Sequence, residues 1–427
     1  MIPARFPPRI VPKSHYRPAP TEANLNSRNQ ERSATAMRRF LLISSVLAGW
    51  LSATPAAFSQ DAATVRIAYL TQEVEQPPAL SNLDEPPSDE GLAGARLAIA
   101  DNDSTGRFLK QRFDLDAVTV PIDGDPADAL RDLAGKGHRI VVLDLPGAAA
   151  GQLARLPEAA NLLLFNAGST DDSLRNEACA PNLLHTMPNR AMLADALAQY
   201  LAVKRWTKWL LVTGPRPEDK LYAAAVKRAA KRFGAEVVEE KTWTGEHDAR
   251  RTAQAEIPVL TQGKRHDVVI VADEIGDFGD YMMYRTWEPR PVAGTQGLVP
   301  TNWHRAHEAW GAAQLQSRFK TAAQRLMLPR DHAVWAAIRA VGEAATRTRS
   351  TDPTALTAYI KGPDFNLAAF KGVPLSFRSW DGQLRQPVLV AADRSLVTVS
   401  PQEGFLHPKT ELDSLGYDQP ETGCRQR

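Results

Sequence analysis

Apolar and polar residues alternate along the chain from Val65 onward. The run from Val65 to Leu70 has the composition of a strand, and residues 91–100, after a polar loop, carry apolar side chains at helical spacing. Further strands are predicted at 113–121, 139–143 and 161–165, with helices at 125–136 and 148–156. Continuous apolar strands separated by amphipathic helices are typical of a parallel sheet covered on both faces. The pattern predicts a first α/β unit.

A second series of the same kind follows. Helices are predicted at 191–206, 218–233 and 249–261, and strands at 209–213, 236–243 and 267–272. Two Ala-rich stretches at 305–327 and 331–347 predict long helices, and β-rich runs follow at 373–377, 387–392 and 395–400. The fold class predicted is α/β, with two Rossmann-like lobes, each with a parallel sheet, joined by several hinge crossovers. Because open α/β sheets bind ligands outside the carboxyl ends of their strands, we expect a cleft between the lobes.

The first 59 residues have the pattern of an export signal preceded by an extension. Met37-Arg38-Arg39 precedes an apolar run, and small residues end the segment at Ser59. The apolar run is shorter than the roughly 20 residues that a membrane-spanning helix needs. We expect a signal peptide at 37–59, cleaved near Ser59, a periplasmic protein, and a non-native or disordered extension at 1–36. The expected lobes are 60–188 with 301–350 and 189–300 with 351–400, followed by a C-terminal tail at 401–427.

The charge of the chain depends on that first segment. The whole chain has 51 Lys and Arg against 49 Asp and Glu, but residues 1–59 hold eight of the bases and two of the acids. The remainder has 43 basic and 47 acidic residues, a net charge of −4. A basic, nucleic-acid-binding protein is therefore not indicated, and no nucleic acid partner is expected.

The chain has two cysteines, Cys179 and Cys424. An even number in an exported protein favours a disulfide, which would tie the end of the chain to a loop in its middle. The alternative is two unrelated free thiols. Neither cysteine has a second Cys or a His at zinc-binding spacing, so no metal site is predicted there.

Motifs of catalytic sites are missing from the sequence. It has no Gly-x-Ser-x-Gly, His-Glu-x-x-His, Gly-Lys-Ser/Thr phosphate loop or Gly-x-Gly-x-x-Gly. Asp101 to Gly106 imitates the start of a calcium loop, but Arg112 stands where a bidentate Glu is required. His304 and His307 could share a helix face without a further ligand at a telling distance. We expect no enzyme, no catalytic residue, no metal and no cofactor.

Acidic residues gather in the loop from Glu73 to Glu90. The simpler interpretation is a solvated loop that ends in helix-start acids. The alternative is a loop that shapes a cleft entrance or binds a hard cation such as calcium or a lanthanide.

The order of elements from Val65 to Ser400 resembles type I periplasmic binding proteins of the Leu/Ile/Val-binding kind. The stretches that carry this resemblance are Asp219 to Ala223, Phe233 to Val238, Phe370 to Phe377 and Asp381-Gly382. It implies the solute-binding component of an ABC importer, with a permease at the inner membrane as its partner. A hinged clamp that closes on a small molecule follows from that resemblance.

A narrower resemblance concerns the binding proteins of PQQ-dependent alcohol dehydrogenase systems. Its runs are Tyr284 to Thr295, Trp380 to Pro387 and Val399 to His407. It implies a role in periplasmic alcohol oxidation, with PQQ, an alcohol-derived acid or a related molecule as the ligand. The alternative is a sensor or chaperone for PQQ or a metal ion, with the same fold and no transport.

The type I resemblance also implies where the ligand is bound. The matching positions are Asp144, Ala167, Ser169, Thr170, Tyr222, Asp273, Glu274 and Gln296. Amino-acid-binding relatives use a hydroxyl in the first of these loops and a carboxylate in the last, where this chain has Asp144 and the neutral Gln296. Because Gln cannot offer the charge that stabilises an ammonium group, we expect a ligand other than a plain α-amino acid.

Each of these residues has a simpler interpretation. Ser169 and Thr170 could serve turn or cap chemistry, Tyr222 could pack within its helix, and Asp273 with Glu274 could be solvated. Trp287 and Trp303 could line an aromatic ligand or be structural.

Overall fold

The computed structural model describes residues 63–74, 86–244 and 249–424. The expected signal peptide and extension lie outside these residues, as does most of the acidic loop between Glu73 and Glu90. None of the helices in the described part of the chain combines the length and apolarity needed to cross a membrane.

The first sheet has five parallel strands in the order β2-β1-β3-β4-β5. Its strands are β1 (Ala63–Gln72), β2 (Gln111–Val120), β3 (Ile140–Asp144), β4 (Leu163–Asn166) and β5 (Leu183–His185). Helices α1 (Leu92–Gly106), α2 (Pro126–Gly135) and α3 (Gly147–Ala154) alternate with them. All five residues of β3 are buried, as expected for a central strand with helices on both faces.

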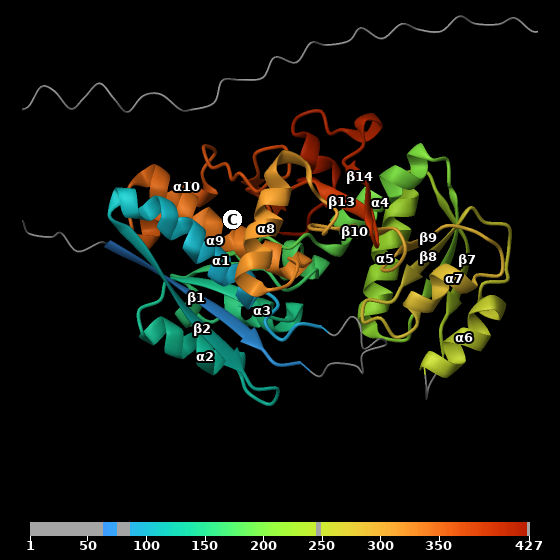
Figure 1. The fold of residues 1–427 in the computed structure, drawn as a ribbon, viewed down its shortest axis with the longest axis horizontal. Coiled ribbons are helices and arrows are strands. Elements are labelled where there is room, and N and C mark those ends of the chain that lie inside the picture. Colours follow the sequence, from blue (N-terminus) through green and yellow to red (C-terminus); the bar gives the residue numbers. More distant parts are fainter. Residues whose placement is uncertain (1–62, 75–85, 245–248, 425–427) are drawn as a thin grey trace, which may run out of the picture. The chain divides into compact units, whose positions relative to one another are not determined.

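The second sheet has four parallel strands in the order β7-β6-β8-β9. They are β6 (Lys208–Thr213), β7 (Glu236–Thr242), β8 (Val268–Ala272) and β9 (Val292–Gly294). The helices of this part are α4 (Arg190–Val203), α5 (Pro217–Arg232), α6 (Ala249–Leu260) and α7 (Met282–Arg285). The two parallel sheets and their alternating helices, shown in Figure 1, confirm the predicted α/β class.

The last third of the chain adds antiparallel strands and three helices. The strands are β10 (Val299–Thr301), β13 (Val388–Ala392) and β14 (Ser395–Ser400) in one sheet, and β11 (Ser376–Phe377) with β12 (Leu384–Arg385) in another. The helices are α8 (Ala312–Ala323), α9 (Pro329–Thr348) and α10 (Pro353–Lys361). Short 3-10 helices lie at Arg107–Leu109, Pro157–Ala159, Asp172–Arg175, Gly279–Tyr281, Ala309–Gly311, Glu403–Phe405 and Glu411–Ser414.

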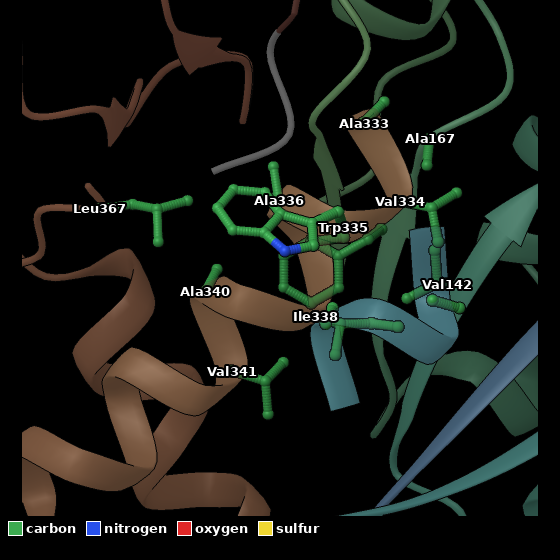
Figure 2. Close-up of a cluster of buried hydrophobic side chains, with 14 of the residues drawn as sticks. Val142, Ala167, Ala333, Val334, Trp335, Ala336, Ile338, Ala340, Val341 and Leu367 are labelled. Carbon is green, nitrogen blue, oxygen red and sulfur yellow. The ribbon is translucent and has the colours of Figure 1, made fainter. Parts of the chain in front are cut away.

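Helix α9 is the centre of the largest apolar core. Figure 2 shows Val334 beside Val142 of β3 and Trp335 further along the same helix. The helix also packs closely on α1, because Gly94 lets the backbones meet: a Cβ atom on Gly94 would collide with the carbonyl group of Asp331. The small side chains of both helices therefore allow an approach that larger ones would prevent.

The predicted elements differ from the observed ones in three places. The helix expected at 305–327 is limited to α8, because the chain takes a left-handed conformation at Trp310 and Gly311 before it and at Gln324 after it. The strand expected at 373–377 is only β11. Strands β5, β9, β10 and β12 and helices α7 and α10 were not predicted; the strands are two or three residues long, too short for a clear period.

The packing of α10 bears on the expected lobe bounds. Leu356, Ile360 and Leu384 belong to the core of the first sheet, whereas Val388 packs with Met192 of α4. Residues from 356 to 384 thus pack with the core of the first sheet, within the range 351–400 that was assigned to the second lobe. The expected lobe bounds stay a prediction.

Candidate ligand-binding site

Asp144, the last residue of β3, lies at the carboxyl edge of the first sheet. It is buried, its Oδ2 accepts a hydrogen bond of 2.7 Å from the Tyr69 hydroxyl, and its Oδ1 lies 3.5 Å from Nε of Arg330. Burial raises the pKa of Asp144, and the charge of Arg330 and the Tyr69 hydroxyl oppose that rise. The carboxylate is therefore held by its own chain.

Three loops of the first sheet converge on this carboxylate. A Cβ atom on Gly91 would lie 2.5 Å from Asp144 Oδ2, and one on Gly168 would lie 2.5 Å from Oδ1. A Cβ atom on Gly147 would lie 2.9 Å from the Ser169 hydroxyl. The glycines are needed here because any side chain would push apart the loops that follow β1, β3 and β4.

The loop from Ala167 to Thr170 is fixed by hydrogen bonds to its own chain. Asn166 Oδ1 accepts from the Ser169 amide at 2.9 Å, and Asn166 Nδ2 donates to the Ser169 carbonyl at 2.9 Å. The Ser169 hydroxyl accepts from the Asp171 amide at 3.1 Å, which is turn chemistry. The Thr170 carbonyl accepts from the Arg190 amide at 2.9 Å, and its side chain is half-buried.

Arg175, which was not predicted as a site residue, supports this loop from behind. Its guanidinium is fully buried and donates to the carbonyls of Ser169 at 3.3 Å and Asp171 at 2.9 Å. It also donates to the Met187 carbonyl at 2.7 Å and to Gln383 Oε1 at 2.9 Å. Burial lowers the pKa of Arg175 to about 10. A single Arg in a polar loop gives no signal of this role in the sequence.

Asp273 follows β8 at the carboxyl edge of the second sheet. Its two carboxylate oxygens accept from the amides of Gly276, Asp277, Phe278 and Gly279, at 3.1, 3.0, 2.9 and 2.6 Å. Four amide donors leave this carboxylate no open face for a ligand cation. Asp273 therefore shapes the turn that follows the strand.

Gln296 ties two loops of the second sheet together. Its Nε2 donates to the Asp273 carbonyl at 3.0 Å, and its Oε1 accepts from the Thr295 hydroxyl. Both ends of the amide are thus used within the chain.

Glu274 forms a two-pronged ion pair with Arg190, the first residue of α4. The Arg190 Nε and Nη2 donate to the two carboxylate oxygens at 2.9 and 2.6 Å. Burial raises the pKa of Glu274, and the hydrogen bonds and charge of Arg190 oppose that rise. Because the Arg190 amide also binds Thr170, this arginine brings the loop of the first sheet and the loop of the second sheet together.

Tyr222 of α5 differs from the other predicted residues. Its hydroxyl is buried, and no hydrogen-bond partner is found for it among the described residues. Burial raises the pKa of this phenol, and the charge of Glu274 adds to the effect. A buried hydroxyl without a partner is a polar group that a ligand could satisfy.

A pocket of about 250 Å³ lies beside Arg190. Asp171, Asp172 and Asn176 line it from the chain after β4, and Leu221 and Arg228 line it from α5. None of the eight predicted residues lines this pocket. Two of them, Thr170 at the first sheet and Glu274 at the second, contact Arg190, which does line it. Trp303 is buried and stacks on His332, with ring centroids 4.4 Å apart, so it is structural, whereas Trp287 is exposed.

The cysteines and the possible metal ligands also bear on the site. In the described ranges, no three His, Cys, Asp or Glu side chains are grouped so that they could hold a metal ion. Cys179 and Cys424 form a disulfide, which confirms that prediction.

Comparison with known proteins supports the fold. Residues 87–278 match the model of a family described as periplasmic binding protein. No curated protein matches the chain.

Solved structures cover most of the chain at low identity. A branched-chain amino acid ABC transporter periplasmic ligand-binding protein from Burkholderia xenovorans LB400 has a TM-score of 0.67 at 15% identity, and covers 85% of this chain and 99% of its own. A leucine-, isoleucine-, valine-, threonine- and alanine-binding protein from Brucella ovis, in a closed conformation, has a TM-score of 0.63 at 17% identity. The match covers 85% of this chain and 99% of that protein. A solute-binding protein from R. palustris in complex with benzoate has a TM-score of 0.59 at 12% identity. The match covers 85% of this chain and 99% of that protein. Residues 87–278 are therefore similar to the periplasmic binding protein family, and the chain has the type I fold of these proteins.

Proposed function

We propose that this chain is the periplasmic solute-binding component of an ABC importer, and that it binds a small molecule where the loops of its two sheets meet. The observation that carries the proposal is the position of Arg190, whose amide binds Thr170 and whose guanidinium binds Glu274. A molecule bound beside it would contact loops of both sheets, and would stabilise the closed arrangement of the lobes. The family match and the similar transporter proteins support a binding role, a periplasmic location and a permease partner, and favour binding over catalysis.

The proposed ligand class is a small carboxylic acid. An ammonium group needs a carboxylate with free oxygens, and Asp144, Asp273 and Glu274 are engaged by their own chain. Groups that could each bind an acid are the half-exposed guanidinium of Arg330, which also faces Asp144, the Tyr222 hydroxyl and the half-buried Thr170 side chain. One similar structure holds benzoate, which agrees with this class.

Isothermal titration of the purified protein tests this proposal. We expect saturable heat with benzoate, 3,4-dihydroxybenzoate or a short aliphatic acid, and at least tenfold weaker binding of leucine. Tight binding of leucine with no response to any acid would reverse the proposed class. Turnover of an added alcohol or amide would favour an enzyme instead.

A second candidate, binding or sensing of PQQ, rests on the sequence runs that resemble PQQ-linked binding proteins. In the first run Tyr284 and Trp287 are exposed, and in the second Gln383 and Gln386 donate to backbone carbonyls between the sheets. The run from Tyr284 ends at Thr295, whose hydroxyl accepts a hydrogen bond from the Asp273 amide and donates one to Gln296 Oε1. Titration followed by PQQ absorbance tests this candidate, and an unchanged spectrum at saturating protein would remove it.

A further inference from the structure

The end of the chain crosses between the parts of the molecule that carry the two sheets. We name residues 416–424 the C-terminal strap. Its last residue, Cys424, is bonded to Cys179, which lies shortly before β5 of the first sheet. The Thr422 hydroxyl donates to the Arg175 carbonyl at 2.8 Å, and the Gly423 amide donates to Asn176 Oδ1 at 3.0 Å. One end of the strap is thus attached to residues 175–179 by a covalent bond and two hydrogen bonds.

The other end of the strap is attached to α4 and α5, which pack on the second sheet. The Gly416 amide donates to Asp195 Oδ2 at 2.9 Å, and the Gly416 carbonyl accepts from Arg228 at 3.0 Å and Arg232 at 2.6 Å. The Arg228 guanidinium lies 4.3 Å from the ring centroid of Tyr417 and pairs with Glu421 at 3.1 Å. These contacts come from two helices and involve buried charge, so this end is also firmly held.

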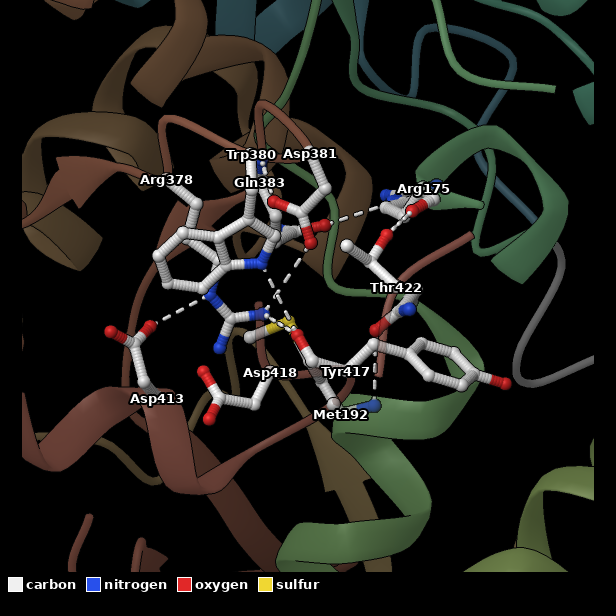
Figure 3. Close-up of polar contacts among 12 residues, drawn as sticks. Arg175, Met192, Arg378, Trp380, Asp381, Gln383, Asp413, Tyr417, Asp418 and Thr422 are labelled. Atoms are coloured by element: carbon white, nitrogen blue, oxygen red, sulfur yellow. Dashed lines mark hydrogen bonds and ion pairs between the residues drawn. The ribbon is translucent and has the colours of Figure 1, made fainter. Parts of the chain in front are cut away.

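The first residues of the strap and the residues just before it contact the chain between β11 and β12. Figure 3 shows the Arg378 guanidinium between Asp413 and Tyr417: it donates to Asp413 Oδ1 at 2.8 Å and to the Tyr417 carbonyl at 3.3 Å. Arg378 also donates to the Leu415 carbonyl at 2.7 Å. The same part of the chain carries Gln383, which binds Arg175. The strap therefore lies against the residues that join the two sheets.

In the described part of the chain, the backbone passes between the two sheets at 186–189, 301–303 and 384–388. The Gln386 side chain donates to the Thr186 carbonyl at 2.8 Å, which holds the first and last of these passes together. The strap is a further connection, and it is closed by a bond that does not detach when the protein moves. The strap also contacts Arg175, because the Thr422 hydroxyl donates to the Arg175 carbonyl. The Arg175 guanidinium in turn donates to the carbonyls of Ser169 and Asp171.

We propose that the C-terminal strap is a disulfide-fastened tether that limits how far the two lobes open and keeps the Ser169 to Asp171 loop in place. In the oxidising periplasm the fastener stays closed. Reduction to two thiols, by a dithiol that is itself oxidised to a disulfide, would free the end of the strap at Cys179 and widen the range of lobe openings. This rests on the proposed function only in that lobe opening is the motion of ligand binding.

The test measures the distance between the lobes without any ligand. Spin labels are attached to p-acetylphenylalanine introduced at Phe108 near the first sheet and at Lys231 on α5, both exposed, so that no new cysteine is added. Pulsed electron–electron double resonance then gives the distribution of distances between the two labels in the oxidised protein, in the C179S/C424S variant and in E421Q. We expect the distribution of C179S/C424S to be at least twice as broad, or to gain a longer distance. E421Q removes ion pairs of the strap but keeps the disulfide, and should match the parent.

An unchanged distribution in folded C179S/C424S, judged by circular dichroism, would overturn the proposal. Should that variant fail to fold, the parent protein treated with a phosphine reductant gives the same comparison, and an unchanged distribution there overturns it equally. A broadened distribution in a protein that binds none of the acids supports the tether while the proposed function fails.

Discussion

The guanidinium of Arg190 holds the carboxylate of Glu274 with two hydrogen bonds of 2.9 and 2.6 Å, and both side chains are mostly buried. This pair joins the first turn of α4 to the loop after β8. A two-pronged arginine–carboxylate pair fixes direction as well as distance, so it sets where the two loops lie.

Replacing Arg190 by Gln should leave Glu274 mostly buried without its partner. We expect a loss of unfolding free energy on the order of 3 kcal/mol, the usual cost of breaking a buried pair from one side. Urea denaturation measures it. The exposed Arg131, which pairs with Asp128, is the matched control, and R131Q should cost at most about 1 kcal/mol. Equal losses in R190Q and R131Q would contradict the central place given to Arg190.

Tyr222→Phe removes a buried hydroxyl without a described partner. The free protein should keep its stability or gain up to about 1 kcal/mol, because the variant no longer buries an unsatisfied group. Affinity for the ligand should fall about tenfold, since a hydrogen bond to the ligand is lost. Urea denaturation measures the stability and calorimetric titration measures the affinity, each against Y284F, which alters an exposed side chain. A destabilised Y222F with unchanged affinity would show that the hydroxyl is structural.

Asp273→Ala should destabilise the protein, since four amides lose their acceptor. We expect about 2 to 4 kcal/mol, as for other buried hydrogen-bond networks. Asp132, an exposed helix residue, supplies the control D132A. Thermal unfolding of D273A and D132A measures the difference, and D273A should melt at the lower temperature. Similar melting temperatures would be inconsistent with the structural role of Asp273.

Lys371 makes the stability depend on pH. Burial lowers the pKa of Lys371 to about 7, from 10.5 in the unfolded chain. Between these values the unfolded chain binds more protons than the folded one, so unfolding free energy should rise with pH from about 7 to 10.5. The rise is at most about 1.4 kcal/mol per pH unit.

The variant K371M removes this titration and should show a flatter slope between pH 7 and pH 9. The Lys371 amino group donates to Gln386 Oε1 and to the Pro387 carbonyl, so K371M also loses these two bonds, which lowers the unfolding free energy in addition to flattening the slope. Urea midpoints at several pH values separate the two effects. Parallel slopes in K371M and the parent would mean that another group titrates.

Local patterns in the sequence predicted the fold well where they are long. Strand β3 was expected at 139–143 and lies at Ile140–Asp144, because the four consecutive apolar residues from Ile140 to Leu143 are typical of a strand buried on both faces. Strand β5 is three residues long and α10 follows a loop, so neither stands out locally. The hydrophobic pattern of the sequence thus predicted the long strands of the two sheets but not their short edge strands.

The chemistry of the site was less predictable, since its partners are distant in the sequence. Asp144 and Gln296 are predicted to contact a ligand, which stays a prediction; within the chain Asp144 accepts from Tyr69 and Gln296 donates to the Asp273 carbonyl. Arg175 reaches Gln383, 208 residues away, and no local pattern encodes such a contact. The resemblance to type I binding proteins therefore indicated the loops in which site residues lie. Only the folded chain shows which of their side chains have no partner within the chain.

The most direct test of the binding site is a thermal-shift measurement on the parent protein and on the R190Q/E274Q variant. That variant replaces the charged pair by two neutral amides, so it changes the site without leaving a lone buried charge. Against PQQ, short aldehydes, carboxylic acids and amino acids, we predict a saturable rise in melting temperature of the parent with at least one small acid, and none with the variant. A parent that no compound stabilises, or a rise of equal size in the variant, would contradict the binding site placed at Arg190.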